Sequence, residues 1–320
     1  MWTVIQQIFP YAIIFTIPLL ITALGGLFSE RSGVVNIALE GLMVIGAFSG
    51  ALTIYFLQGS MPNTWALWIG LLVAALVGML FSILHAFASI NLSANQIISG
   101  TAINMIATAL TVFLARNITG SGNVRITTGF LPKDATIFGI NLSNIPILGD
   151  LFFSKSVPTT WFVLAILLIS TFVLYKTKFG LRLRSCGEFP QAAEAAGINV
   201  RRVRYSGVLI SGAFAGLGGG LIIVTYAGEF TGTVSGLGFL ALAALIFGQW
   251  KPLGVLAATL FFGLASTIAN VSQVIPELAV FPPIILKIFP YVVTLIALVL
   301  FSKSSQAPKA AGEPFDSGKR

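Results

Sequence analysis

Within residues 29–48, SERSGVVNIALEGLMVIGAF, the carboxylate of Glu40 follows the uncharged residues 32–39 and precedes the uncharged residues 41–48, which have the composition of an apolar helix. A charged side chain at the centre of a membrane helix costs roughly 2.5–3.5 kcal/mol on an insertion scale, so an acid there needs compensation. Asn36 lies four residues earlier on the same helical face and could share a hydrogen-bond network with Glu40. Two interpretations stay open: Glu40 lines a path for a solute, or it caps the start of a neighbouring broken helix.

The rest of the chain has the same apolar character. It has 320 residues, of which 56% are hydrophobic and 9% charged, and its mean hydropathy is +0.95. This is too apolar for a water-soluble domain. Uncharged runs of about 20 residues, the length that crosses a bilayer, recur from end to end. We therefore predict an all-α integral membrane protein, a polytopic bundle of about nine transmembrane or broken, re-entrant helices within residues 1–301.

Basic residues predict the orientation of the bundle. Residues 176–204 contain seven Lys or Arg against two acids, so the positive-inside rule places this loop in the cytoplasm. Alternation of the spans then puts residues 116–157 outside the cell and the tail, residues 302–320, inside. The tail is rich in Lys, Ser, Ala, Gly and Pro, and we expect it to be disordered. The net charge of +8 is explained by these loops, so no nucleic-acid partner is expected.

Helix-breaking residues mark candidate path segments. They occur at Ser32-Gly33, around Asn95 and Gly100, and in residues 231–238 just before Phe239. Broken spans at membrane depth are tolerated where they line a cavity or are buried in protein. The other glycines, which follow small-xxx-small spacing, are better explained by close helix packing: Gly46, Gly50, Gly212, Gly216 and Gly220.

Two further sets of residues could contact a solute. Asn95 and Asn104, with Ser99 or Thr101 between them, could form one polar stripe on an apolar helix, or could only hydrogen-bond to other helices. Glu229 and Phe239 flank the connection that follows the basic loop and the next span. An acid beside an aromatic ring would suit a purine or a sugar, whereas a solvated acid and a lipid-facing ring are the alternative.

The cytoplasmic loop contains a short helix. In residues 187–198, GEFPQAAEAAGI, Pro190 suits a first helical turn, the alanines favour helix, and Gly197 suits its end. Such a helix could simply connect two spans, or it could be a rigid element, which we call the handle, to which a soluble motor protein binds. We expect the handle to involve Glu188, Pro190, Ala193, Glu194 and Gly197.

The sequence does not indicate ATP hydrolysis, a disulfide framework or a metal site. The chain lacks the Gly-x-x-x-x-Gly-Lys-Ser/Thr pattern of nucleotide-binding loops, so we do not expect it to hydrolyse ATP. One cysteine, Cys186, and one histidine, His85, predict neither a disulfide framework nor a metal site, and we assign neither residue a role. No cofactor is expected.

Three blocks of sequence resemble a known family. Residues 26–41, residues 187–205 and residues 236–252 are similar to bacterial ABC-importer permeases for nucleosides, in the wider group that includes ribose and branched-chain amino acid permeases. The resemblance implies a non-enzymatic permease subunit in the cytoplasmic membrane, in which residues 190–198 match the coupling helix that docks on an ATP-binding subunit. It also implies a second permease subunit, usually a different protein, and an extracellular substrate-binding lipoprotein.

The resulting hypothesis is an ATP-driven nucleoside importer whose path is lined by Asn36, Glu40, Asn95, Asn104, Glu229 and Phe239. The same architecture carrying ribose or another simple sugar is the first alternative. The second is a proton-coupled secondary transporter in which Glu40 carries the proton. We predict that Glu40 instead orients polar groups at the path or a broken helix end.

Overall fold

The computed structural model describes residues 2–137, 140–147, 149–271, 285, 288, 289, 292 and 306–316. Within these residues, seven helices are long and apolar enough to cross a membrane. They are α1 (Trp2–Arg31), α2 (Leu39–Leu57), α3 (Asn63–Ala86) with its π-helical extension Phe87–Asn91, α4 (Gln96–Thr119), α5 (Pro158–Lys176), α8 (Val200–Ile222) with its π-helical extension Ile223–Ala227, and α10 (Pro252–Val271). The all-α, polytopic prediction is confirmed.

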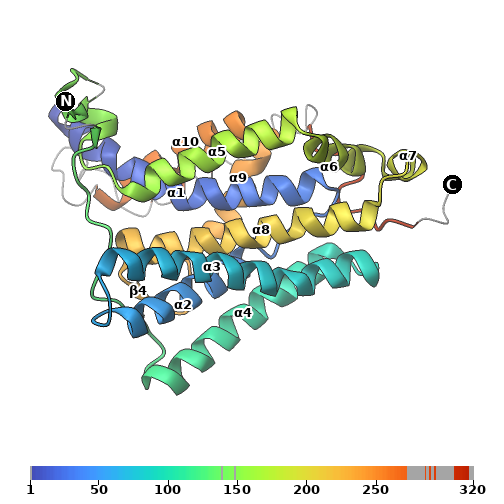
Figure 1. Cartoon of the computed structure of the whole chain (residues 1–320), viewed down its shortest axis with the longest axis horizontal. Helices are drawn as coiled ribbons and strands as arrows, with labels where there is room; N and C mark the ends of the chain where they lie inside the picture. Colours follow the sequence, from blue (N-terminus) through green and yellow to red (C-terminus); the bar gives the residue numbers. More distant parts are fainter. Residues whose placement is uncertain are drawn as a thin grey trace.

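Three shorter helices complete the described bundle. The basic loop, residues 176–204, forms α6 (Lys178–Glu188) and α7 (Pro190–Ala195), and an apolar helix too short to cross the bilayer, α9 (Leu237–Phe247), precedes α10. The long helices lie side by side, with α6, α7 and residues 306–316 at one end of the bundle and the start of α1 at the other (Figure 1). The further span predicted after α10 falls largely outside the described residues.

The segment 116–157 contains short strands. β1 (Val124–Arg125) pairs antiparallel with β4 (Glu229–Phe230), and β2 (Thr136–Ile137) pairs with β3 (Ile140–Asn141). Two helical turns, Leu142–Asn144 and Gly149–Phe153, follow. Because β1 holds β4, this external segment is attached to the chain that leaves α8 and enters α9.

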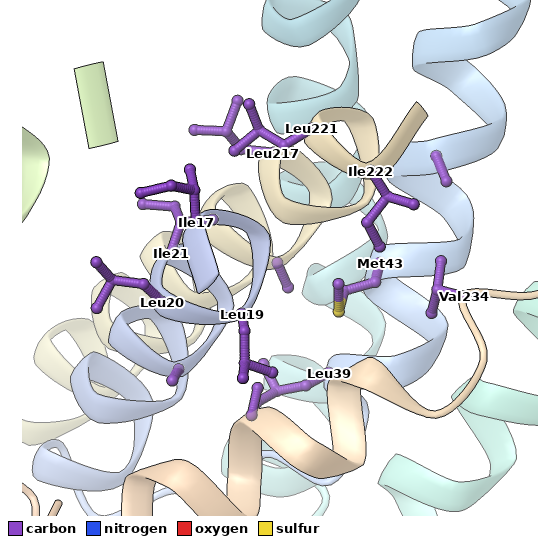
Figure 2. Close-up of a cluster of buried hydrophobic side chains, with 14 of the residues drawn as sticks. Ile17, Leu19, Leu20, Ile21, Leu39, Met43, Leu217, Leu221, Ile222 and Val234 are labelled. Atoms are coloured by element: carbon purple, nitrogen blue, oxygen red, sulfur yellow. The ribbon is translucent and has the colours of Figure 1, made fainter. Parts of the chain in front are cut away.

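Glycines hold three helices in close contact. A Cβ atom on Gly46 of α2 would overlap the backbone of Gly216 on α8, and one on Gly216 would overlap the carbonyl oxygen of Ala74 on α3. Gly50, Gly212 and Gly220 also face neighbouring helices. The packing interpretation of these glycines is therefore confirmed, and apolar side chains of α1, α2 and α8 fill the core beside them (Figure 2).

The tail differs from the expectation of disorder. Residues 306–316 lie against the helix connections at the α6–α7 end of the bundle, and the side chains of Ala310 and Phe315 are buried. Their backbone groups bond to other connections instead of forming a regular element, so no periodic pattern could reveal the contact. Residues 302–305 and 317–320 of the predicted tail lie outside the described residues.

Candidate solute pocket and coupling surface

The chain between α1 and α2 is not helical, and Asn36 anchors this break. Its side-chain nitrogen donates to the Ser211 hydroxyl at 2.8 Å, and its oxygen accepts from the backbone N–H of Ala38 at 3.1 Å. Asn36 is fully buried. Ser211 lies about two helical turns beyond Arg204 on α8, so the break reaches into the bundle, and Asn36 fixes it there.

Asn104 of α4 binds the other side of the same break. Its oxygen accepts from the N–H of Gly41 at 2.7 Å, and its nitrogen donates to the carbonyl of Ile37 at 3.0 Å. The side-chain amide therefore satisfies backbone groups at the start of α2, which the helix itself cannot pair. This arrangement matches the alternative in which the polar residues of this helix hydrogen-bond to other helices.

Asn95 has a different place from the one the stripe predicted. It is the N-cap of α4, accepting from the N–H groups of Ile97 at 2.9 Å and Ile98 at 3.2 Å, and it is exposed. Asparagine is among the preferred N-cap residues because its oxygen pairs otherwise free N–H groups. The structure therefore does not bring Asn95 together with Asn36 and Glu40.

Glu40 caps α9. One carboxylate oxygen accepts from the N–H of Gly236 at 2.9 Å and the other from the N–H of Gly238 at 2.7 Å. Residues 231–236 are non-helical, and the segment carrying Val234 runs beside Met43 of α2 into α9 (Figure 2). A carboxylate at a helix N-terminus is stabilised by unpaired N–H groups and by the helix dipole. Glu40 thus joins the two broken segments of the bundle.

A cavity of about 460 Å³ lies beside this junction. Its walls come from α1, the end of α8, β4, the chain that enters α9, α9 itself and α10. Six polar side chains line it: Glu229, Thr231, Thr233, Ser235, Ser266 and Asn270. The volume and the mixture of polar and apolar walls are typical of a small-molecule site.

The sequence alone did not indicate that two aromatic rings line this cavity. Phe15 of α1 and Tyr226 at the end of α8 have centroids 4.5 Å apart with planes at 42°. They come from distant parts of the chain, so no local spacing connects them. Glu229 lines the cavity as its candidate role requires, but Phe239 is absent from the lining and is 47% exposed on α9. The aromatic rings that line the cavity together with Glu229 are therefore those of Phe15 and Tyr226.

Glu40 acts on the cavity indirectly. Ser235 and Leu237 line the cavity and flank Gly236, whose N–H binds Glu40. The carboxylate therefore fixes the chain that forms one wall without lining the cavity itself. Glu40 is a positioning residue in this arrangement.

A second cavity, of about 770 Å³, lies between residues 129–156 and the N-terminal ends of α3 and α5. It shares no lining residue with the first. Its walls include Trp68, Phe130 and Trp161, and rings at helix ends are typical of the membrane–water interface. Because the smaller cavity is walled by the start of α9, the segment that Glu40 caps, we take that one as the candidate solute pocket.

Helix α7, the predicted coupling helix, has an inner and an outer face. Pro190 and Ala193 are buried, whereas Glu194 and Gly197 are exposed and Glu188 is half-buried. Pro190 and Ala193 thus hold the helix in place rather than presenting a surface. The exposed side is formed by Phe189, Gln191, Ala192, Glu194 and Ala195, which we call the outer face of α7.

Phe189 was not singled out from the sequence, although a phenylalanine in a basic cytoplasmic loop was a signal. Its side chain is 63% exposed directly before α7. Exposed aromatic side chains are over-represented among the residues that dominate protein interfaces. Phe189 is therefore the strongest candidate anchor for a partner on this face.

A polar network connects the coupling loop to α1 and to the α9–α10 turn. The Arg31 guanidinium lies 3.6 Å from the Glu188 carboxylate and donates to the Trp250 carbonyl at 2.7 Å. The Trp250 indole donates in turn to the buried Glu30 carboxylate. Since Trp250 follows α9, Arg31 links the loop carrying α7 to the end of α9, the helix whose start Glu40 caps.

The described residues contain no group of three or more His, Cys, Asp or Glu side chains placed to hold a metal ion. His85 is buried, with its two ring nitrogens 3.1 Å from the Ser99 hydroxyl and 3.0 Å from the Val35 carbonyl. It joins α3, α4 and the α1–α2 break as a packing residue.

The described bundle thus combines two non-helical segments, a polar pocket beside the start of α9, and a short helix with an exposed face at one end. Residues 8–298 match the family model described as the permease component of the branched-chain amino acid transport system. The chain belongs to this permease family. It is a multi-pass membrane protein and a transport component rather than an enzyme.

Several known proteins are similar to this permease along most of its length. The guanosine ABC transporter permease protein NupQ of Bacillus subtilis is 46% identical, with 99% of this chain and 98% of that protein covered. The nucleoside ABC transporter permease protein NupC of Lactococcus lactis is 43% identical, with 96% of each covered. The guanosine ABC transporter permease protein NupP of Bacillus subtilis is 29% identical over 81% of this chain and 70% of that protein.

We expect Phe189→Ala to weaken the attachment of the partner ATPase. Truncating an aromatic anchor at an interface costs about 2 kcal/mol or more, or roughly a 30-fold loss of affinity. Co-purification of the ATPase with the solubilised permease measures the loss. Leu181→Ala is the matched control, because Leu181 is also 63% exposed but lies on α6. Equal retention of the ATPase by both variants would contradict the anchor role of Phe189.

Proposed function

We propose that this chain is a membrane-embedded permease subunit of an ATP-driven nucleoside importer. The observation that carries the proposal is the cavity in which Glu229 and the Phe15–Tyr226 rings meet, next to the broken start of α9. Support for nucleosides as the solute comes from NupQ and NupC, whose names specify guanosine and nucleosides.

The cavity offers groups for both parts of a nucleoside. A carboxylate can accept hydrogen bonds from two neighbouring hydroxyl groups, as on a ribose ring. The Phe15 and Tyr226 rings offer apolar faces to a planar base, and Thr231, Thr233 and Asn270 can bond to its polar edge. We therefore assign ribose to Glu229 and the base to the ring pair.

Transport requires that the pocket open alternately to the two sides of the membrane. In our proposal an ATPase docks on the outer face of α7, and closure of the ATPase domains moves the coupling loop. Arg31 and Trp250 carry the movement to α1 and α9, whose start forms a wall of the pocket. Such a change is driven by the different affinities of ATP for the two states of the motor.

The complete importer contains further chains in this proposal. NupQ and NupP are both named guanosine permeases of Bacillus subtilis, which supports a pair of different permease subunits here. The resemblance of the sequence to ABC importers supports an extracellular substrate-binding lipoprotein as the donor of solute. The bound ATP belongs to the ATPase partner, and no cofactor is proposed for this chain.

The direct test is uptake of labelled guanosine by cells with and without the gene, challenged separately with other nucleosides, free base and ribose. We expect gene-dependent uptake that nucleosides inhibit and ribose does not. Inhibition by ribose alone would contradict the nucleoside assignment and indicate a sugar permease.

At the level of the pocket, we expect Glu229→Gln to raise the KM for guanosine about 10- to 100-fold. A hydrogen bond to a charged group contributes about 1.5–3 kcal/mol, and 1.4 kcal/mol corresponds to a factor of ten. Asp134→Asn is the control, because Asp134 is an external acid that lines the other cavity. A normal KM for Glu229→Gln together with a raised KM for Asp134→Asn would place the solute site in the larger cavity.

A further inference from the structure

Residues 306–316, which we call the strap, cross the same end of the bundle as α7. The N–H of Gln306 donates to the Gln249 side chain at 3.0 Å, in the α9–α10 turn. The N–H of Ala310 donates to the carbonyl of Gly187 at 2.9 Å, at the end of α6. A single segment thus bonds to the turn that follows the pocket helix and to the loop that carries the coupling helix.

The strap also reaches the α1–α2 break and the start of α8. The N–H of Gly312 donates to the carbonyl of Gly33 at 3.2 Å. The Arg204 guanidinium donates to the carbonyl of Glu313 at 2.9 Å. Four connections that are distant in sequence therefore share one bridging segment.

Phe315 anchors the strap behind α7. Its side chain is buried and packs in one cluster with Cys186, Ala193 and Val200. Ala193 belongs to the inner face of α7, so the Phe315 ring supports the coupling helix from below. The outer face of α7 stays exposed while the strap is bound.

Arg204 shows why the strap is bound firmly. The side chain is 1% exposed, and its guanidinium carbon lies 5.8 Å from the centre of the Phe315 ring. Its Nε and Nη2 atoms have no hydrogen-bond partner among the described residues. A buried guanidinium is costly unless it is paired, so the Glu313 carbonyl and the Phe315 ring stabilise a charge that the bundle alone leaves poorly compensated.

We propose that the strap is part of the coupling surface: it holds α7 in the position in which the ATPase docks and ties that position to the α1–α2 break and the α9–α10 turn. The coupling role rests on the proposed function, whereas the docking of the strap does not. A strap that only competed with the ATPase would have to cover the outer face of α7, and it contacts the inner face.

Cys186 is a natural reporter of strap docking. It is the single cysteine of the chain and is fully buried against Phe315. Burial raises the pKa of the thiol to about 11, so thiolate is scarce at neutral pH while the strap is docked. Alkylation by N-ethylmaleimide in membranes, read as the modified Cys186 peptide by mass spectrometry, therefore measures how often the strap opens.

The first arm compares three variants of the full transporter: Phe315→Ala, removal of residues 306–320, and Lys309→Ala, an exposed strap position. We expect the first two to raise the alkylation rate at least tenfold and Lys309→Ala to leave it unchanged. Equal rates in all variants and in the unchanged protein would overturn the docking of the strap.

The second arm measures ATP hydrolysis and guanosine uptake by the same variants. We expect Phe315→Ala and the truncation to lose at least tenfold in uptake per ATP hydrolysed, with Phe315→Leu restoring much of the loss by refilling the space. Fast alkylation with normal uptake would overturn the coupling role. If the unchanged transporter takes up no nucleoside, the proposed function fails, and the alkylation arm still decides whether the strap is docked.

Discussion

Replacing Glu40 with Leu is expected to reduce uptake at least tenfold while the protein still inserts into the membrane. The substitution leaves the N–H groups of Gly236 and Gly238 without their acceptors. Each buried, unsatisfied donor costs about 1–3 kcal/mol, and both lie at the start of α9. The wall of the pocket formed by Ser235 and Leu237 then loses its fixed position. Uptake by cells with matched amounts of membrane-inserted permease measures the effect.

The Glu40→Gln variant distinguishes a positioning role of Glu40 from a role in proton transport. Glutamine has one acceptor oxygen, and its NH₂ group cannot accept from a backbone N–H. We therefore expect an intermediate loss of uptake, smaller than that of Glu40→Leu. If Glu40 carried a proton, Gln would be as harmful as Leu, and an imposed proton gradient would drive uptake without ATP. That pair of results would overturn the capping role.

Replacing Gly46 with Ala is expected to destabilise the bundle. In an isolated helix, alanine is more favourable than glycine by about 1 kcal/mol. Here the added Cβ would overlap the backbone of Gly216, so α2 and α8 have to move apart. Overpacking of this kind typically costs 1–3 kcal/mol, and we expect the midpoint of thermal denaturation in detergent to fall by about 5 °C or more.

Two other glycines serve as comparisons for the Gly46→Ala variant. A Cβ on Gly50 would lie 3.2 Å from the carbonyl oxygen of Gly70, so Gly50→Ala should have a smaller effect. A Cβ on Gly122, in the external segment, would have no neighbour closer than 3.7 Å, so Gly122→Ala should leave the midpoint nearly unchanged. A midpoint for Gly46→Ala at or above that of the unchanged protein would show that α2 and α8 are not in this close contact.

The effect of the Glu40 substitutions depends on an architectural feature of the bundle: two of its segments are not helical. Asn36 and Asn104 satisfy the backbone around the α1–α2 break, and Glu40 satisfies the start of α9. Without these side chains, unpaired backbone groups would be left away from water, which costs several kcal/mol each. The polar residues that looked like solute contacts are, for the most part, what allows the breaks to exist.

The sequence by itself determined the features that depend on neighbouring residues along the chain. Apolar runs of bilayer length specify membrane-spanning helices because lipid offers no hydrogen-bond partners, so the backbone N–H and C=O groups have to pair with one another. Pro190 and Gly197 bound the coupling helix because each acts on its own backbone conformation; Gly197 has φ of +79°, which glycine adopts at little cost. The spacing of the glycines likewise predicted close packing.

Only the tertiary structure decided which groups meet. Asn95, Asn104 and Glu40 have similar settings in the sequence, yet one caps its own helix, one bonds to α2 and one caps α9. The Phe15–Tyr226 pair and the strap likewise bring together residues far apart in the chain. A polar or aromatic side chain can pair with any suitable group within reach. Which group that is depends on how the neighbouring helices are placed, and the local sequence does not specify this placement.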